Sequence, residues 1–112
     1  MDNTLIYQNT IINLLNEYAD FWKTTQGIQN QVIIDKEHHF YQLLMVGWRD
    51  STHYIHTTAF HFAIIEGKIW IHQNNTEALI ADELVERGVS KSDIVLGFIA
   101  PEVRAYTGFA VA

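Results

Sequence analysis

The clearest hydrophobic pattern is a pair of alternating apolar runs that meet at Glu66-Gly67, in the stretch FHFAIIEGKIWIHQ over residues 60–73. Two strand-period runs joined by a two-residue loop ending in glycine are typical of a β-hairpin. The register then pairs Ile65 with Lys68, Ile64 with Ile69, Ala63 with Trp70, Phe62 with Ile71 and His61 with His72. Alternation predicts an apolar face of Phe60, Phe62, Ile64, Ile69 and Ile71 and, opposite it, a mixed face of His61, Ala63, Ile65, Lys68, Trp70 and His72.

A helical period marks the N-terminal segment from Thr4 to about Thr25. Its apolar positions are spaced by three and four residues, as on one face of an amphipathic helix: Ile11, Ile12, Leu14, Leu15, Tyr18, Phe21 and Trp22. We expect this long helix to cover the apolar face of the hairpin. The aromatic residues at its end are predicted to belong to the core rather than to a ligand site.

Two further strands are predicted before the hairpin, Gln31–Asp35 and Phe40–Trp48, and His53–Ile65 continues into it. Gly47 suggests a bulge or a close approach of two backbones. Consecutive strands joined by short polar turns favour an antiparallel four-stranded meander.

The C-terminal third predicts a second helix over Thr76–Arg87, with Thr76 as N-cap and Gly88 beyond its end. Residues 90–97 have the spacing of a capping box and predict a short helix, while the β-prone IVLGF run leaves a strand open as the alternative. Pro101–Arg104 is typical of one helical turn, and residues 106–112 are expected to be extended. The fold class is therefore α+β, with a single domain over residues 1–112.

Composition is consistent with one soluble core, since 48% of the 112 residues are hydrophobic. There is no apolar run long enough for a membrane helix and no basic segment before an apolar one, so we expect neither a membrane span nor a cleaved leader. The absence of cysteine removes disulfides and thiolate chemistry and makes the cytoplasm the default location. A formal net charge of −6 argues against direct nucleic-acid binding, because such binding needs Lys and Arg to neutralise phosphates.

Candidate chemistry is sparse. His61 and His72 face each other in the predicted register, and two imidazoles could share a divalent metal ion. Zinc requires three or four ligands, so ordinary surface histidines are the preferred interpretation and no metal or cofactor is predicted. Common mechanistic motifs such as GxSxG, a Walker loop, GxGxxG and HExxH are absent from the sequence, and no catalytic residue is predicted.

Several segments in a fixed order carry a family resemblance: GKIWI at 67–71, Thr76-Glu77, DIVLGF at 93–98 and FAVA at 109–112. In this order they resemble the XisI family, known as fdxN element excision controlling factors, over about residues 31–112. Two departures are an Asn74 where the family has an acidic residue nearby and a Ser90 where it has proline. The first weakens any metal role for that loop, and the second exchanges one helix starter for another.

The resemblance implies a small cytoplasmic protein, common in cyanobacteria, that acts with a XisH-type partner in controlling site-specific excision of a DNA element. XisH resembles nucleases, so a regulatory or stabilising subunit is the expected role. The alternatives are a direct DNA-binding factor and a metal-dependent enzyme that uses His61 and His72. Apolar surface in excess of what a small sheet can bury also suggests a homodimer.

Most recurrent residues of the family have structural explanations: Gly67 in the turn, Gly88 after the helix, and a core of Ile69, Ile71, Ile94, Leu96 and Phe98. Trp70 and Arg104 remain, and these residue types dominate interface energetics. We therefore predict a partner-binding site at Trp70, His61, His72, Lys68 and Arg104. The alternative is that the Thr76–Arg87 helix covers the mixed face and makes Trp70 part of the core.

Overall fold

The computed structural model describes residues 3–22 and 27–112. Along the chain its elements are α1 (Thr4–Phe21), β1 (Ile28–Asp35), β2 (Phe40–Asp50), β3 (His53–Ile65), β4 (Lys68–Asn74), α2 (Ile80–Glu86), η1 (Lys91–Asp93), β5 (Ile94–Leu96) and η2 (Pro101–Tyr106). The predicted end of the first helix near Thr25 lies outside the described residues. Among those residues, no helix is both long and apolar enough to cross a membrane.

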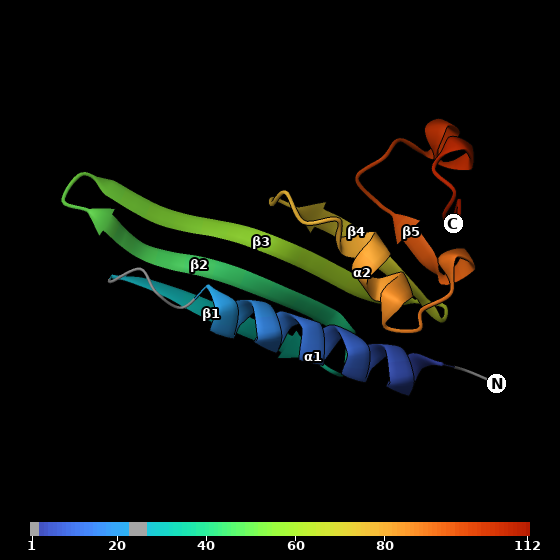
Figure 1. Ribbon diagram of the computed structural model, residues 1–112, viewed down its shortest axis with the longest axis horizontal. Helices are drawn as coiled ribbons and strands as arrows, with labels where there is room; N and C mark the ends of the chain where they lie inside the picture. The colour runs from blue at the N-terminus through green and yellow to red at the C-terminus, as the bar shows by residue number, and fades with distance from the viewer. Residues whose placement is uncertain (1–2, 23–26) are drawn as a thin grey trace.

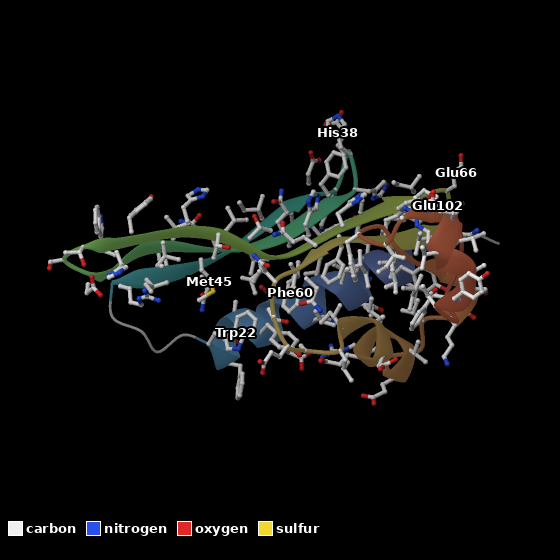
Figure 2. All side chains as sticks on the ribbon, turned by 90° about the horizontal axis from the view of Figure 1, so that it is seen from above. Trp22, His38, Met45, Phe60, Glu66 and Glu102 are labelled. Atoms are coloured by element: carbon white, nitrogen blue, oxygen red, sulfur yellow. The ribbon has the colours of Figure 1, made fainter. Side chains whose placement is uncertain are left out.

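The strands form one sheet in the order β1-β2-β3-β4-β5, so the predicted meander of β1 to β4 is confirmed and the fold is α+β (Figure 1). β1 to β4 are antiparallel, and β5 joins the edge of β4 in parallel. Figure 2 shows α1 and α2 together below the sheet. The two helices therefore form a layer that covers one side of the sheet, and the opposite side carries the mixed face.

The core lies between the helical layer and the apolar side of the sheet. The predicted apolar face of the hairpin is buried throughout, and the inward stripe of α1 meets it at Ile11, Leu14 and Leu15, all fully buried. From α2, Ile80 and Leu84 complete the cluster. Each large aliphatic or aromatic side chain buried in this way contributes about 1.5–3 kcal/mol relative to exposure.

Polar contacts join the two helices over this core. The Tyr18 hydroxyl of α1 donates to the Glu83 carboxylate of α2 at 2.5 Å, and Arg87 donates to Glu17 at 2.7 Å. Burial together with the Glu83 hydrogen bond raises the pKa of Tyr18 to about 12.

Phe21 corrects the prediction of an aromatic core at this end of α1: Tyr18 and Trp22 pack against the core, whereas Phe21 is 78% exposed. It lies on the outer side of the helix, past the last buried turn.

The hairpin turn between β3 and β4 has positive φ at both loop residues, 51° at Glu66 and 77° at Gly67. Two such residues make the type I′ geometry whose twist matches the flanking strands. The predicted register is confirmed from Ile65↔Lys68 to Phe62↔Ile71. One turn residue that is not glycine, Glu66, thus adopts the left-handed conformation.

The second helix begins later than predicted, at Ile80 rather than Thr76. Asn74 accounts for the delay, because its Oδ1 accepts hydrogen bonds from both the backbone N–H and the hydroxyl of Thr76. The Thr76 hydroxyl oxygen in turn accepts from the N–H of Ala78. Side chains of this kind compete with helix formation by closing local turns, so Thr76 serves a loop rather than a helix cap.

Residues 90–97 contain a single 3₁₀ turn and a short strand in place of the predicted helix. A single 3₁₀ turn at Lys91–Asp93 leads into β5, which pairs Ile94 with Ile69, Val95 with Trp70 and Leu96 with Ile71. Ile94 and Val95 are fully buried on opposite sides of the sheet. A strand that is covered on both faces suits β-branched residues. This explains why the segment forms a strand, the alternative to the predicted helix.

Beyond the helical layer, β2 and β3 continue as a long arm (Figure 1). Gly47 and Gly27 lie face to face here: a Cβ on Gly47 would fall 1.9 Å from the Gly27 carbonyl oxygen. The predicted close approach at Gly47 is therefore confirmed. It allows the first residue of β1 to pair directly with β2.

Candidate partner-binding face

A bulge shapes the centre of the mixed face. Between His61 and Phe62 the register shifts by one residue, so His61 pairs with Gln73 and not, as predicted, with His72. His72 is the extra residue on β4. A bulge keeps consecutive side chains on nearly the same side and increases the local twist. The two imidazoles therefore remain neighbours, with ring centroids 5.1 Å apart, although they are not a register pair.

The His61 ring is enclosed. The Phe40 ring of β2 meets it edge-on at 6.2 Å, and its buried Nε2 makes no hydrogen bond within the described residues. Burial lowers the pKa of His61, and the nearby His72 lowers it further. Burial also lowers the pKa of His72. Both shifts favour the neutral form of the imidazole.

A metal site at these histidines lacks ligands in the part of the chain that the structure describes. No group of three or more His, Cys, Asp or Glu side chains is gathered there. Two imidazoles supply half of the usual zinc coordination. The arrangement therefore gives no support to a metal-dependent reaction at His61 and His72.

Trp70 lies beside the histidines and under the C-terminal segment. Its ring stacks on His72 at 6.1 Å, and the Arg104 guanidinium lies over it at 5.1 Å from the ring centre. The alternative in which the second helix covers Trp70 is wrong in its geometry, since α2 packs on the other side of the sheet (Figure 2). Residues 97–112 provide a partial cover instead, and Trp70 stays half-buried.

Arg104 is itself buried, and backbone carbonyls surround its guanidinium. Its nitrogens donate to the carbonyl oxygens of Ile99 at 3.0 Å, Val111 at 3.3 Å and Gly97 at 3.5 Å. A planar fork with several fixed donors suits this arrangement better than a lysine would. Arg104 therefore fastens the C-terminal segment and holds it against Trp70.

The C-terminal residues also reach the hairpin turn. Lys68 donates through Nζ to the Ala112 oxygen, and Ala110 bridges to Val95 of β5. A Cβ on Gly97 would lie 3.3 Å from the Trp70 ring, so the segment passes close above it. The five predicted site residues are thus brought together at one end of the sheet, and His61, His72, Trp70 and Arg104 form a continuous chain of ring and cation contacts.

Phe40 is a member of this face that the sequence reasoning did not find. It packs on His61 because Phe40 pairs with Ala63 across β2 and β3. That register depends on a second bulge, which separates the Leu43↔Phe60 and Leu44↔Thr58 pairs. Alternation alone carries no signal for a bulge at this position.

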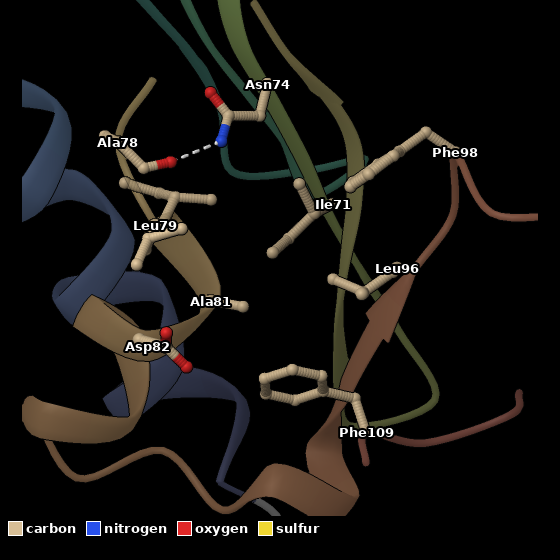
Figure 3. A pocket seen from close by; sticks show the side chains of 10 residues that line it. Ile71, Asn74, Ala78, Leu79, Ala81, Asp82, Leu96, Phe98 and Phe109 are labelled. Carbon is tan, nitrogen blue, oxygen red and sulfur yellow. Dashed lines mark hydrogen bonds between the residues drawn. The ribbon is translucent and has the colours of Figure 1, made fainter. Parts of the chain in front are cut away.

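A separate pocket lies on the other side of the sheet, between α2 and the β4–β5 edge (Figure 3). Its volume is about 210 Å³, and apolar side chains line most of it. Asn74 closes one end by donating to the Ala78 carbonyl at 2.8 Å. Phe98, predicted to be core, lies at this pocket and is 53% exposed, because the chain turns away from the sheet after β5.

The comparisons with known proteins match this architecture along its whole length. The family model described as XisI protein matches residues 1–111. The chain belongs to the XisI family. A crystal structure of a XisI-like protein from Anabaena variabilis ATCC 29413 is 42% identical, with a TM-score of 0.91, over 96% of this chain and 98% of that one.

A second solved member of the XisI family is the fdxN element excision controlling factor XisI from Anabaena variabilis ATCC 29413. It is 32% identical, with a TM-score of 0.84, over 99% of this chain and all of that one. No curated protein matches the chain. The mixed face described above therefore belongs to a XisI-type fold.

Proposed function

We propose that the chain is a non-enzymatic regulatory protein that controls excision of a DNA element by binding a XisH-like protein. The observation that carries this proposal is the match, over 99% of the chain, to the solved structure of an fdxN element excision controlling factor. The XisH-like partner is inferred from the resemblance of the sequence to the XisI family. The neutral, half-exposed aromatic and imidazole surface supports binding rather than catalysis.

Within this proposal, Trp70 is the central contact and Arg104 its positioning residue. Interfaces draw most of their energy from a few aromatic and arginine side chains set among neutral contacts. Trp70 offers a large ring that the guanidinium of Arg104 holds in place, and His72 extends the same surface. Lys68 and His61 flank this centre.

Co-expression with the nearest XisH-like neighbour tests the proposal. We expect a stoichiometric complex by size-exclusion chromatography with light scattering. Trp70→Ala and His72→Ala should weaken it by tenfold or more, as expected for central contacts. Phe21→Ala is the matched control, because it removes an exposed aromatic ring from the helical side of the molecule.

The absence of any complex between wild-type proteins would overturn the proposal. A complex that Trp70→Ala and His72→Ala leave intact would keep the partner and reject the mixed face. Circular dichroism of each variant separates a lost contact from a lost fold.

A further inference from the structure

β1 is an edge strand, and the outer row of its backbone groups has no strand beside it. Within the described residues, the sheet order places β2 on one side of β1 and nothing on the other. The Gly27 carbonyl accepts the Trp48 N–H, so the backbone groups of Gly27 face β2. Successive residues of a strand direct these groups to opposite sides. Four residues of β1 therefore direct theirs outward: Ile28, Asn30, Val32 and Ile34.

β1 lacks the features by which proteins protect a free sheet edge. Protected edges are short or bulged, carry Lys or Pro, or lie under another segment. β1 has eight residues, contains neither Lys nor Pro, and pairs with β2 without a register shift. The opposite edge differs, because β5 has three residues and Ala110 forms a bridge to its Val95. β1 is thus a long and regular template for a further strand.

The charge of β1 is confined to Asp35, its last residue. That carboxylate is engaged in its own turn. It accepts hydrogen bonds from the N–H groups of Glu37 and His38 at 3.0 Å and lies 2.9 Å from a ring nitrogen of His38. The turn rises on the side of the sheet away from the helices, where His38 is labelled (Figure 2). Residues 28–34 therefore present an edge without formal charge.

The flank of α1 beside β1 continues this uncharged surface. Asn30 donates to the Ala19 carbonyl at 3.1 Å, which ties this side of α1 to β1. Asn16 is exposed and lies three residues before Ala19, on the same side of the helix. Asp20 is the nearest carboxylate on this flank, one turn beyond Asn16. Residues 4–16 carry no charged side chain.

We propose that two copies of this chain pair their β1 strands antiparallel across a two-fold axis and join their five-stranded sheets into one. With Gln31 on the axis, the outward-facing residues of the two copies lie opposite each other, as a hydrogen-bonded antiparallel pair requires. This register adds about eight backbone hydrogen bonds. The pairs, one residue from each copy, are Gln31 with Gln31, Asn30 with Val32, Gln29 with Ile33 and Ile28 with Ile34.

The properties of β1 favour a second copy as the occupant. An identical strand presents the same free edge at the same concentration, and in this register no two like charges face each other. Ile28 meets Ile34, and the amide of Gln31 meets its own equivalent. The two α1 helices also run antiparallel, so Asp20 of each copy approaches the uncharged residues 4–16 of the other. The pairing does not depend on a XisH-like partner.

Sedimentation velocity of the untagged chain, without any partner protein, tests the dimer. We expect the mass of two chains at micromolar concentration. Gln31→Lys places two ammonium groups opposite each other on the axis and should raise the dimer Kd at least tenfold. Val32→Pro removes an N–H that points away from β2. It should have the same effect while the hydrogen bonds between β1 and β2 remain.

Gln42→Lys is the matched control. It makes the same substitution one strand further in, on β2, where Gln42 pairs with Ile33, and the dimer should persist. Circular dichroism confirms that each variant is folded, and Gln31→Lys decides the question where Val32→Pro alters folding.

A wild-type monomer up to about 100 μM would overturn the proposal, because contacts with a lower Kd are populated at that concentration. A dimer that Gln31→Lys leaves intact, or one that Gln42→Lys disrupts equally, would also overturn it. Failure to bind a XisH-like protein would reject the proposed function but not the dimer, since this measurement contains no partner.

Discussion

At the scale of a single residue, the surroundings of His61 change the pKa of its side chain. Its Nε2 is buried without a hydrogen bond within the described residues, and burial lowers its pKa from 6.5. The folded protein therefore resists protonation of this ring more than the unfolded chain does. The stabilising effect is complete above the unfolded pKa near 6.5 and is lost as the pH falls through the lower folded pKa.

We predict that His61→Phe removes this pH dependence. At pH 8 the variant should be within about 1 kcal/mol of wild type, because a buried unpaired nitrogen is replaced by an apolar ring of similar shape. The difference in unfolding free energy, wild type minus variant, should then decrease as the pH is lowered from about 7 to 5. Urea unfolding at several pH values measures it. Gln42→Asn is the control, because it changes the paired strand without altering a titratable group, and its difference in unfolding free energy should not vary with pH. A difference for His61→Phe that does not vary with pH would contradict the prediction.

At the scale of elements, the close approach of β1 and β2 depends on Gly47. Its φ is 144°, and an added Cβ would meet the Gly27 carbonyl, which already accepts a hydrogen bond from the Trp48 N–H. We predict that Gly47→Ala destabilises the protein by about 3 kcal/mol or more, since backbone strain and a main-chain clash combine.

Gly88→Ala is the control for this prediction. Gly88 has a φ of 101° after α2, but nothing lies within 4 Å of the Cβ position. Only the conformational strain remains, about 1–2 kcal/mol. Chemical denaturation of both variants compares the two costs. Equal losses would show that the contact with Gly27 contributes nothing.

The elements divide into those that the sequence could predict and those that it could not. Hydrophobic period located α1 and β3, and the Glu66-Gly67 loop set the register as far as Phe62. The start of α2 was missed because the Asn74 side chain closes a local turn. The histidine pairing was missed because a bulge adds a residue on β4. The first feature is a local side-chain turn and the second is a β-bulge, and hydrophobic periodicity carries no signal for either.

The candidate site shows the same division. Trp70 and Arg104 were identified by residue type and family resemblance, and the structure brings them into contact. Sequence could not indicate that the C-terminal segment, rather than α2, covers Trp70. That cover depends on the parallel addition of β5, which turns residues 97–112 onto the mixed face.

For the whole molecule, the distribution of basic groups bears on whether it binds DNA directly. Of the basic side chains that the structure describes, Arg104 is buried, Arg87 is paired with Glu17, and Lys68 is bonded to Ala112. Lys36 lies in the turn between β1 and β2, Arg49 lies near the end of β2, and Lys91 lies over the Phe109 ring. Scattered cations on a chain of net charge −6 release few counterions from DNA, so non-specific affinity should be weak.

We therefore predict that the chain alone gives no mobility shift with duplex DNA at about 50 mM salt, where phosphate contacts are strongest. A shift that appears only when a XisH-like protein is added would place DNA contact on the partner and leave this chain in a regulatory role. The control for charge is an Asp82→Lys, Glu86→Lys variant, which places two cations at exposed positions of α2 and should gain a salt-sensitive shift. A shift by the wild-type chain alone would replace the partner-dependent function with direct DNA binding.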